Sequence, residues 1–427
     1  MSDSSPAANS SSTTMATIFV TAFLDLLGLS LIFPILGELI TDSNYVLGPE
    51  VGDATRNLIY GLLSAAYPFT LFFATSLFGS LSDKIGRKKV LVGTLCVSLL
   101  GYITFTFGVY SANLPLMFVG RAIQGFGAGN LSILYSAVAD ISPNDKKAAN
   151  FGLIGAAFGL GFVIGPFLGG ILANPSWLAQ FDLQDAWFTD YMVFETPFIL
   201  GAFMVFINII QAFFFFRETL PNPDTEKKVS PFTGLVNLGK AMTNIKLRAI
   251  FSVVFLQSFG FTFFTTMMQV FLIQKFGMNA GTIGILFAYI GMVIVFSQAV
   301  LVRYFASRVS SRKMVPIALL GQSLALLVPL LATELWHLYL VFPAIAVFQA
   351  LVQPNISTMV SNMAPAHLQG ETLGMQQSVQ AMSQIIPPLA GGLIVSWSLT
   401  SPLWLASATI FIAWLTFFVD TRKGSIE

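Results

Sequence analysis

The feature that most constrains this chain is a series of twelve long apolar runs, each close to the length that a helix needs to cross a bilayer. A spanning helix takes roughly 20 predominantly apolar residues. Only helices and closed barrels satisfy their backbone hydrogen bonds within lipid, so runs of this length predict an all-α membrane protein with twelve transmembrane helices. We place the runs near residues 16–40, 58–80, 89–109, 114–138, 149–173, 195–216, 249–273, 281–302, 314–333, 336–358, 373–396 and 402–419.

The composition agrees with a membrane location and excludes other classes of protein. Charged residues make up 10% of the 427 residues and hydrophobic residues 55%, whereas a soluble domain has roughly a quarter of its residues charged. The net charge of +1 argues against a nucleic-acid partner, which requires clustered positive charge. Because Cys96 is the one cysteine, no intrachain disulfide can form. We expect a multi-pass protein of the cell membrane (the inner membrane in a Gram-negative bacterium), with the lipid bilayer around it.

The distribution of Lys and Arg predicts the orientation of the chain in the membrane. Cytoplasmic loops retain positive charge. With the N-terminus inside, Arg56 and Lys275 fall outside and Arg121 lies within a run, which leaves 18 of the 21 basic residues in the cytoplasm. We therefore predict an even number of spans with both termini cytoplasmic.

Internal repetition divides the chain into two halves. The segment GSLSDKIGRKK at 79–89 recurs as RYFASRVSSRK at 303–313, and GPFLGG at 165–170 recurs as PPLAGG at 387–392, at offsets of 224 and 222. Parallel repeats of this kind occur in transporters that bind substrate between the halves. The predicted order is a disordered tail 1–15, a six-helix bundle 16–217, a Pro-containing linker 218–247, a second six-helix bundle 248–419 and a tail 420–427.

Four motifs carry a resemblance to a known family. They are Asp25-x-x-Gly28-x5-Pro34 in the first run, Gly79-x-Leu81-x-Asp83-x-x-Gly86-Arg87-Lys88 between the second and third, Arg121-x-x-Gln124-Gly125-x-Gly127 in the fourth, and Gly152-x8-Gly161-x3-Gly165-Pro166-x2-Gly169-Gly170 in the fifth. With these motifs the chain resembles the major facilitator superfamily over essentially its whole length, and its drug:proton antiporters in particular. The segments ADISP at 139–143, FETPF at 194–198, RETLP at 217–221 and QGETLG at 369–374 are most similar to tetracycline efflux pumps.

The resemblance implies a charge network that locks the outward-facing state. Its members would be Asp83, Arg87 and Asp140, the last at the end of the fourth run. The alternative is that the basic residues here only fix the topology. Ser307 and Ser310 stand where Asp83 and Gly86 would be in the second half, so we expect a weaker lock there.

The glycines of the fifth run have two compatible interpretations. Residues spaced by four share a helix face, and small residues let helices approach closely in lipid. The resemblance implies in addition that this motif prevents leak during antiport. The motif comprises Gly161, Gly165, Pro166, Gly169 and Gly170.

Asp25 and Arg121 are the ionisable residues best placed deep inside predicted spans. A charge near the bilayer centre costs about 2.5–3.5 kcal/mol on insertion scales, so each requires a partner or a cavity. An aspartate whose guanidinium partner approaches and leaves can load and release a proton. We predict that the two form a proton-coupling pair, with a static structural pair as the alternative. Glu38 and Glu195 lie at helix ends and are predicted to be solvated.

Amide side chains repeat on shared helix faces and indicate a substrate cavity. Unpaired amides are costly in hydrocarbon, so these faces should line water, substrate or other helices. Together they predict a large, mostly uncharged pocket for an amphipathic molecule. The residues assigned to it are Gln124, Asn208, Gln211, Gln257, Phe261, Gln349, Gln353, Gln377, Gln380 and Gln384.

Other sequence signals exclude a cofactor or a resident metal. The near phosphate-binding loop at 234–241 has Ala241 in place of the magnesium-binding hydroxyl residue, and His337 and His367 fall on opposite sides of the membrane. Tetracycline pumps carry an acidic residue in the third helix, a histidine in the eighth and an aspartate in the ninth. The corresponding runs here contain no Asp, Glu or His, which argues against tetracycline as substrate.

We therefore expect a secondary active transporter and not an enzyme. The favoured function is proton-coupled efflux of a small amphipathic compound by a monomer without a cofactor. A metabolite importer or facilitator of the same fold is the main alternative, and a membrane enzyme or receptor is a distant one.

Overall fold

The computed structural model describes residues 6–41, 45–143, 147–173, 194–220, 223–226, 229–230, 232, 236, 239, 245–306, 308–363 and 369–422. The first half contains α1 (Pro6–Leu31), α2 (Phe33–Thr41), α3 (Asp53–Ile85), α4 (Arg87–Tyr110), α5 (Leu114–Gly127), η1 (Ala128–Asn130), α6 (Leu131–Ile141), α7 (Lys147–Leu172) and α9 (Thr196–Phe215). The second half contains α11 (Ile245–Phe276), α12 (Ala280–Phe296), η2 (Ser297–Val302), α13 (Arg303–Ala306), α14 (Ser311–Ala325), η3 (Val328–Leu331), α15 (Leu335–Met363), α16 (Gln369–Ser383), α17 (Ile386–Val395) and α18 (Ser401–Arg422).

Within the described part of the chain, eleven helical stretches are long and apolar enough to cross a membrane. The predicted span 114–138 is the exception, because the structure divides it into α5, the 3₁₀ turn η1 and α6. Glycine is a poor helix former, and this segment has the sequence GFGAGN at 125–130. The glycines also allow close packing: a Cβ on Gly127 would lie 2.3 Å from Ser98 Oγ.

Several predicted element bounds change in the structure. Helix α1 begins at Pro6, so residues 6–15 are helical where the sequence predicted a disordered tail. The predicted linker 218–247 and tail 420–427 lie partly outside the described residues. The run 373–396 is divided before Pro387 and Pro388, where proline cannot donate a backbone hydrogen bond.

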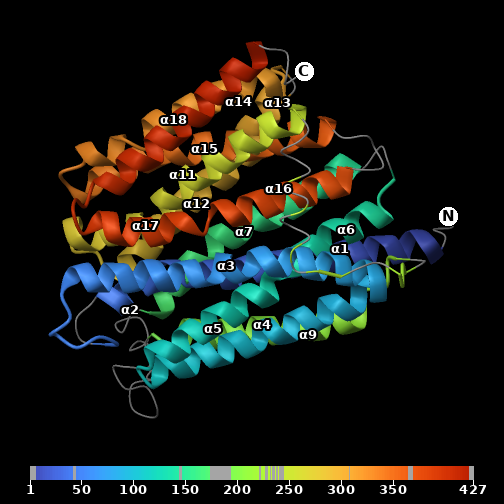
Figure 1. Cartoon of the computed structure of the whole chain (residues 1–427), viewed down its shortest axis with the longest axis horizontal. Helices are drawn as coiled ribbons and strands as arrows, with labels where there is room; N and C mark the ends of the chain where they lie inside the picture. The colour runs from blue at the N-terminus through green and yellow to red at the C-terminus, as the bar shows by residue number, and fades with distance from the viewer. Residues whose placement is uncertain are drawn as a thin grey trace.

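The helices form two bundles that lie side by side (Figure 1). In the N-terminal bundle, α1 packs on α7 and α9, and α4 packs on α5 and α9. In the C-terminal bundle, α11 packs on α18, and α14 packs on α15 and α18. The bundles meet where α7 lies along α12 and where α3 lies along α16 and α17. Both ends of the chain lie at one end of the molecule in Figure 1, which we call the termini end; the opposite end is the far end.

The hydrophobic cores show where the two bundles are joined. One core lies wholly in the C-terminal bundle and includes Phe251 and Phe417. A second belongs to the N-terminal bundle near the termini end and includes Ile18. The third combines residues of both bundles near the far end, among them Tyr60 and Met267. Apolar packing therefore joins the bundles at the far end.

The far-end loop is organised by a basic residue. Arg56 is 2% exposed and donates from Nε to the Val51 carbonyl at 2.8 Å. Its other nitrogens donate to carbonyls of Leu47 and Ile40. Buried guanidinium groups require such acceptors, so Arg56 is used here to hold the loop that precedes α3.

The glycines of α7 bring this helix close to two neighbours. Gly161, Gly165 and Gly169 face α1, and Ser30 Oγ of α1 donates to the Gly161 carbonyl at 2.8 Å. Gly170 faces the other bundle, where a Cβ on it would lie 2.6 Å from the Cα atom of Gly284 in α12. The motif therefore serves one contact within a bundle and one between bundles.

We expect Gly165→Ala to lower the melting temperature of the purified protein in detergent. The added methyl would lie 1.9 Å from Ser30 Oγ and 2.7 Å from the Leu27 carbonyl oxygen, and overpacking typically costs about 1–3 kcal/mol. Gly155→Ala in the same helix is the control, because a Cβ there meets open space. Equal melting temperatures for the two variants would contradict the packing argument.

Candidate functional site

Asp25 is a carboxylate deep in α1 with amide donors on both of its oxygens. Asn130 of η1 donates to Oδ2 at 2.6 Å, and Asn208 of α9 donates to Oδ1 at 3.3 Å. Both asparagines are buried, whereas Asp25 is half-buried. Two other elements, η1 and α9, thus hold the carboxyl group of α1 in place while it retains some accessible surface.

Asn130 was not among the predicted site residues. This residue follows the three glycines of the segment 125–129, and the 3₁₀ turn that they favour places it opposite Asp25. Its signal in the sequence was an amide in an apolar run that shares no regular spacing with other amides.

Arg121 does not bond Asp25, contrary to the predicted pair. Its Nη1 donates to Gln124 Oε1 at 3.0 Å, one helical turn away on α5. The guanidinium carbon lies 4.9 Å from the centroid of the Tyr67 ring, a cation–π contact. In this structure Asn130 and Asn208 bond Asp25 instead, and Arg121 contacts Gln124 and the Tyr67 ring.

The other amides predicted to line one cavity fall into separate groups. Gln211 accepts from Thr21 Oγ1 at 3.4 Å, in the N-terminal bundle. In the C-terminal bundle, Gln257 donates to Gln322 at 3.3 Å and to Gln349 at 3.2 Å, and Gln322 donates to Gln349. Gln322 was not predicted, because it is the one amide in its run and repeats at no helical spacing.

The remaining predicted cavity residues lie on α11, α15 and α16 or just after α16. Gln380 of α16 donates to Gln353 of α15 at 3.2 Å, and Gln377 and Gln384 are half-buried. Phe261 packs against the C-terminal core, with its ring centroid 5.8 Å from that of Phe264. Gln376, which was not predicted, is buried, whereas its predicted neighbour Gln377 is half-buried. Gln376 donates to Ser357 Oγ at 2.9 Å.

A charge network occupies the termini end of the N-terminal bundle. The Arg87 guanidinium pairs with the Asp83 carboxylate one turn before it and with Asp140 Oδ2 of α6 at 3.1 Å. It also donates to Ser82 Oγ at 2.7 Å. Arg87 is 5% exposed, so these acceptors must offset the cost of removing its charge from water. The structure thus brings the three predicted lock residues together.

Glu218, which follows α9, completes this network and was not predicted. Its carboxylate accepts the backbone N–H of Arg87 at 2.9 Å and of Lys88 at 3.2 Å. These N–H groups belong to the first turn of α4 and have no acceptor within the helix. A carboxylate at this position also interacts favourably with the helix dipole. The preceding Gly86 has φ +105°, and a Cβ on it would lie 2.6 Å from Glu218 Oε2.

Further hydrogen bonds tie the start of the linker to the same loop. Thr219 Oγ1 donates to Asp140 Oδ2 at 3.1 Å, and the Asp224 N–H donates to the Asp83 carbonyl at 3.0 Å. Residues 217–220 belong to a motif that the sequence showed, but their position beside α4 depends on the return of α9 to the termini end.

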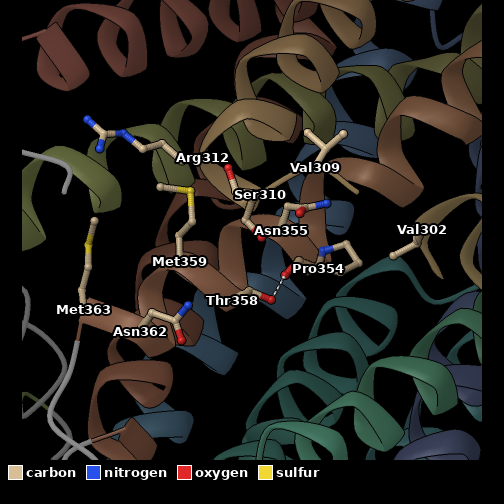
Figure 2. Close-up of a pocket in the computed structure, with 11 residues that line it drawn as sticks. Val302, Val309, Ser310, Arg312, Pro354, Asn355, Thr358, Met359, Asn362 and Met363 are labelled. Atoms are coloured by element: carbon tan, nitrogen blue, oxygen red, sulfur yellow. Dashed lines mark hydrogen bonds between the residues drawn. The ribbon is translucent and has the colours of Figure 1, made fainter. Parts of the chain in front are cut away.

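The repeated loop of the C-terminal bundle borders a pocket of about 510 Å³ (Figure 2). Ser310 and Arg312 line it from the loop side, and Asn355, Thr358 and Met359 line it from α15. Asn362 also lines it and follows Asp140 by 222 residues, the offset of the internal repeat. At the repeat positions that correspond to the charge network of the first half, the second half thus has a pocket lined by both polar and apolar side chains.

Polar contacts cross between the bundles near the far end. Tyr60 donates from its hydroxyl to the Thr266 carbonyl at 2.6 Å, and the Gly37 N–H donates to Gln269 Oε1 at 3.3 Å. The carboxylate of Glu38 accepts the Ala280 N–H in the first turn of α12. Glu38 was predicted to be solvated, but it is half-buried and bonded across the interface.

Glu195 is also more enclosed than predicted. It is 2% exposed, and its Oε1 accepts from the Tyr45 hydroxyl at 2.8 Å. Burial raises the pKa of Glu195 above its usual range, and the Tyr45 hydrogen bond opposes this effect. The prediction of a solvated carboxylate failed because the residue lies under the loop around Tyr45.

Comparisons with known proteins agree with this geometry. The family model for the Major Facilitator Superfamily matches residues 18–304 and 250–426. A tetracycline resistance protein, class H, of Pasteurella multocida is 27% identical over 95% of this chain and 96% of its own length. The quinolone resistance protein NorA of Staphylococcus aureus is 25% identical over 91% and 92%. A D-xylose–proton symporter structure superposes with a TM-score of 0.75 at 14% identity, over 95% and 97% of the two chains.

We expect Glu218→Ala to loosen the first turn of α4. Removing the carboxylate leaves the Arg87 and Lys88 amides without their acceptor, and loss of a cap typically costs about 1 kcal/mol. Hydrogen exchange read by mass spectrometry should show faster exchange at the start of α4. Glu226→Ala, at an exposed position of the linker, should leave this exchange unchanged. Identical exchange in the two variants would contradict the capping role.

Proposed function

Because the chain belongs to the major facilitator superfamily, we propose that it is a secondary active transporter that exports a small amphipathic compound in exchange for protons. The observation that carries the proposal is Asp25, a half-buried carboxylate deep in a membrane helix and held by two buried amides. A charge at this depth is costly and persists where it is used. The names of the relatives, tetracycline and quinolone resistance proteins, support drug-like compounds as the substrate class.

We propose a topology of twelve spans with both termini in the cytoplasm. The eleven helical stretches found by length and composition, together with α5 and α6 as one broken span, give this number. The termini end is then the cytoplasmic side, as its basic residues favour. The proposed units are the bundles 16–217 and 248–419 joined by the linker 218–247, in a monomer surrounded by lipid.

In the proposed mechanism, the two bundles rock about the substrate between them. The far end is the outer side, and there the bundles share an apolar core and polar contacts. Protonation of Asp25 from the outside and its deprotonation toward the cytoplasm drive the cycle. The charge of Arg121 biases this exchange from α5, and the bonded network of Asp83, Arg87 and Asp140 serves as the cytoplasmic lock.

We expect Asp25→Asn to abolish uphill export but to retain some downhill exchange. A permanently neutral side chain cannot take up or release a proton, and the asparagine amide has nearly the shape of the protonated carboxyl group that it replaces. Substrate accumulation driven by a pH gradient in inside-out vesicles measures the first property, and counterflow without a gradient measures the second. Asp53→Asn, at an exposed far-end position, is the control.

An Asp25→Asn protein that still concentrates substrate against its gradient would move the proton site elsewhere. Gradient-driven transport in the opposite direction would favour the importer interpretation. Screening drugs and metabolites in the same vesicles identifies the substrate.

The lock should depend on charge. We expect Asp83→Asn and Arg87→Ala each to lower transport at least about ten-fold, because the buried guanidinium or its acceptor loses its partner. Membrane insertion should persist, since the remaining basic residues still set the topology. Lys89→Ala, which removes an exposed charge two residues away, should transport normally. Normal rates in Asp83→Asn and Arg87→Ala would reduce the network to a structural role.

A further inference from the structure

Two hydrogen-bond donors are buried together in the N-terminal bundle without an acceptor. Arg121 is 5% exposed and Gln124 is 4% exposed, yet Arg121 Nε and Gln124 Nε2 have no partner among the residues that the structure describes. A buried donor without a partner costs roughly 1–3 kcal/mol, and more when it is charged. Two such donors on one helical turn point to a ligand that supplies the acceptor.

The contacts that Arg121 and Gln124 do make fix how they present these donors. Gln124 accepts from Arg121 Nη1 through its Oε1 at 3.0 Å. The amide takes this orientation because, if it were flipped, its NH₂ group would face the N–H donor of Arg121. The face of the Tyr67 ring covers the guanidinium at 4.9 Å. The free Nε–H therefore lies at another edge of the guanidinium plane, and the amide NH₂ of Gln124 is free to donate elsewhere.

The charge of this site defines what it can accept. A guanidinium stays protonated in proteins, and Arg121 bonds an uncharged amide and a ring. Asp25, the other deep ionisable residue of the same bundle, is bonded by Asn130 and Asn208 instead. A positive charge with free N–H groups attracts an acceptor oxygen and repels a permanent cation.

We infer that Arg121 and Gln124 form an acceptor-binding subsite for the transported compound. The ligand class is an amphipathic molecule whose polar end presents an acceptor oxygen, such as a carbonyl or a carboxylate, and not a lipophilic cation. This inference rests on the proposed export function for the identity of the ligand as substrate. It assigns Arg121 a role in specificity in addition to its influence on Asp25.

Three probes of similar shape distinguish recognition of an acceptor oxygen from binding of the apolar part of the molecule. Triphenylphosphine oxide is neutral with a strong acceptor oxygen, triphenylphosphine is neutral without oxygen, and methyltriphenylphosphonium is a cation without an acceptor. Each is titrated into the purified full-length protein, and binding is followed by intrinsic fluorescence. We expect wild type to bind the oxide at least about ten-fold more tightly than the phosphine, and the phosphonium most weakly.

Variants test whether Arg121 and Gln124 supply the selectivity. Gln124→Leu keeps the charge and removes one donor, and Arg121→Lys keeps the charge and removes Nε. Each should lower the affinity for the oxide about ten-fold and leave the affinity for the phosphine unchanged. Gln274→Leu is the matched control, because it removes an exposed far-end amide. Melting temperatures without probe show that each variant is folded.

Several outcomes would overturn the inference. One is wild-type protein that binds the three probes equally or prefers the phosphonium. Another is a parallel loss of affinity for oxide and phosphine in Gln124→Leu, which indicates a structural role or an ordered water only. A third outcome concerns an inorganic anion. Exchanging chloride for gluconate would then lower the melting temperature of wild type but not of Arg121→Lys, and neither Gln124→Leu nor Arg121→Lys would change the affinity for the oxide. In that case the donors hold an inorganic anion instead of substrate.

The binding test is independent of the export test. Equilibrium titration requires no proton gradient, so selective binding of the oxide can hold even if Asp25→Asn retains uphill transport. Conversely, confirmed proton-driven export with unselective binding would overturn the subsite alone.

Discussion

Polar groups inside these helices must find their partners within the protein, because hydrocarbon offers none. This requirement explains why the interior amides occur in bonded groups: Asn130 and Asn208 on Asp25, and the three glutamines Gln257, Gln322 and Gln349 on one another. Each group connects separate helices, so it also fixes how they are arranged. Among the six buried side-chain atoms without a partner in the described residues, the two nitrogen donors are Arg121 Nε and Gln124 Nε2.

Helix approach depends on small residues for a related reason. Apolar burial gives little drive for helices to associate in lipid, so contact area and backbone proximity matter more. Gly165 against Ser30 brings α7 onto α1, and Gly170 against Gly284 brings the same helix onto α12 of the other bundle. One helix therefore has glycine contacts both within its bundle and across the interface. A rocking movement of the bundles would keep the first contact and change the second.

Much of the fold followed from residue type and spacing, and most of the errors arose where tertiary contacts decide. The length of the apolar runs predicted the eleven helical stretches that are long enough to cross a membrane. The charge network was predicted by the resemblance of the motif Asp83 to Arg87 to the family. The break in the fourth span was missed, although its glycines were visible, because periodicity does not show that Ser98 packs against Gly127. The partners of Asp25 could not be predicted, since Asn130 is 105 residues distant and Asn208 is 183. Two opposite charges in one bundle suggested a pair, whereas uncharged amides bond both.

The two halves of the chain differ in charge. The first half has the ion network at the termini end and both deep ionisable residues. In the second half, the repeated loop has Ser310, and Asn362 stands 222 residues after Asp140. In the described part of the C-terminal bundle, the interior polar groups named above are neutral amides and hydroxyls, whose hydrogen bonds do not depend on a proton. A proton gradient acts only on groups that change charge, so in the proposed cycle it acts on the N-terminal bundle. The C-terminal bundle then follows through the contacts that join it to α3 and α7.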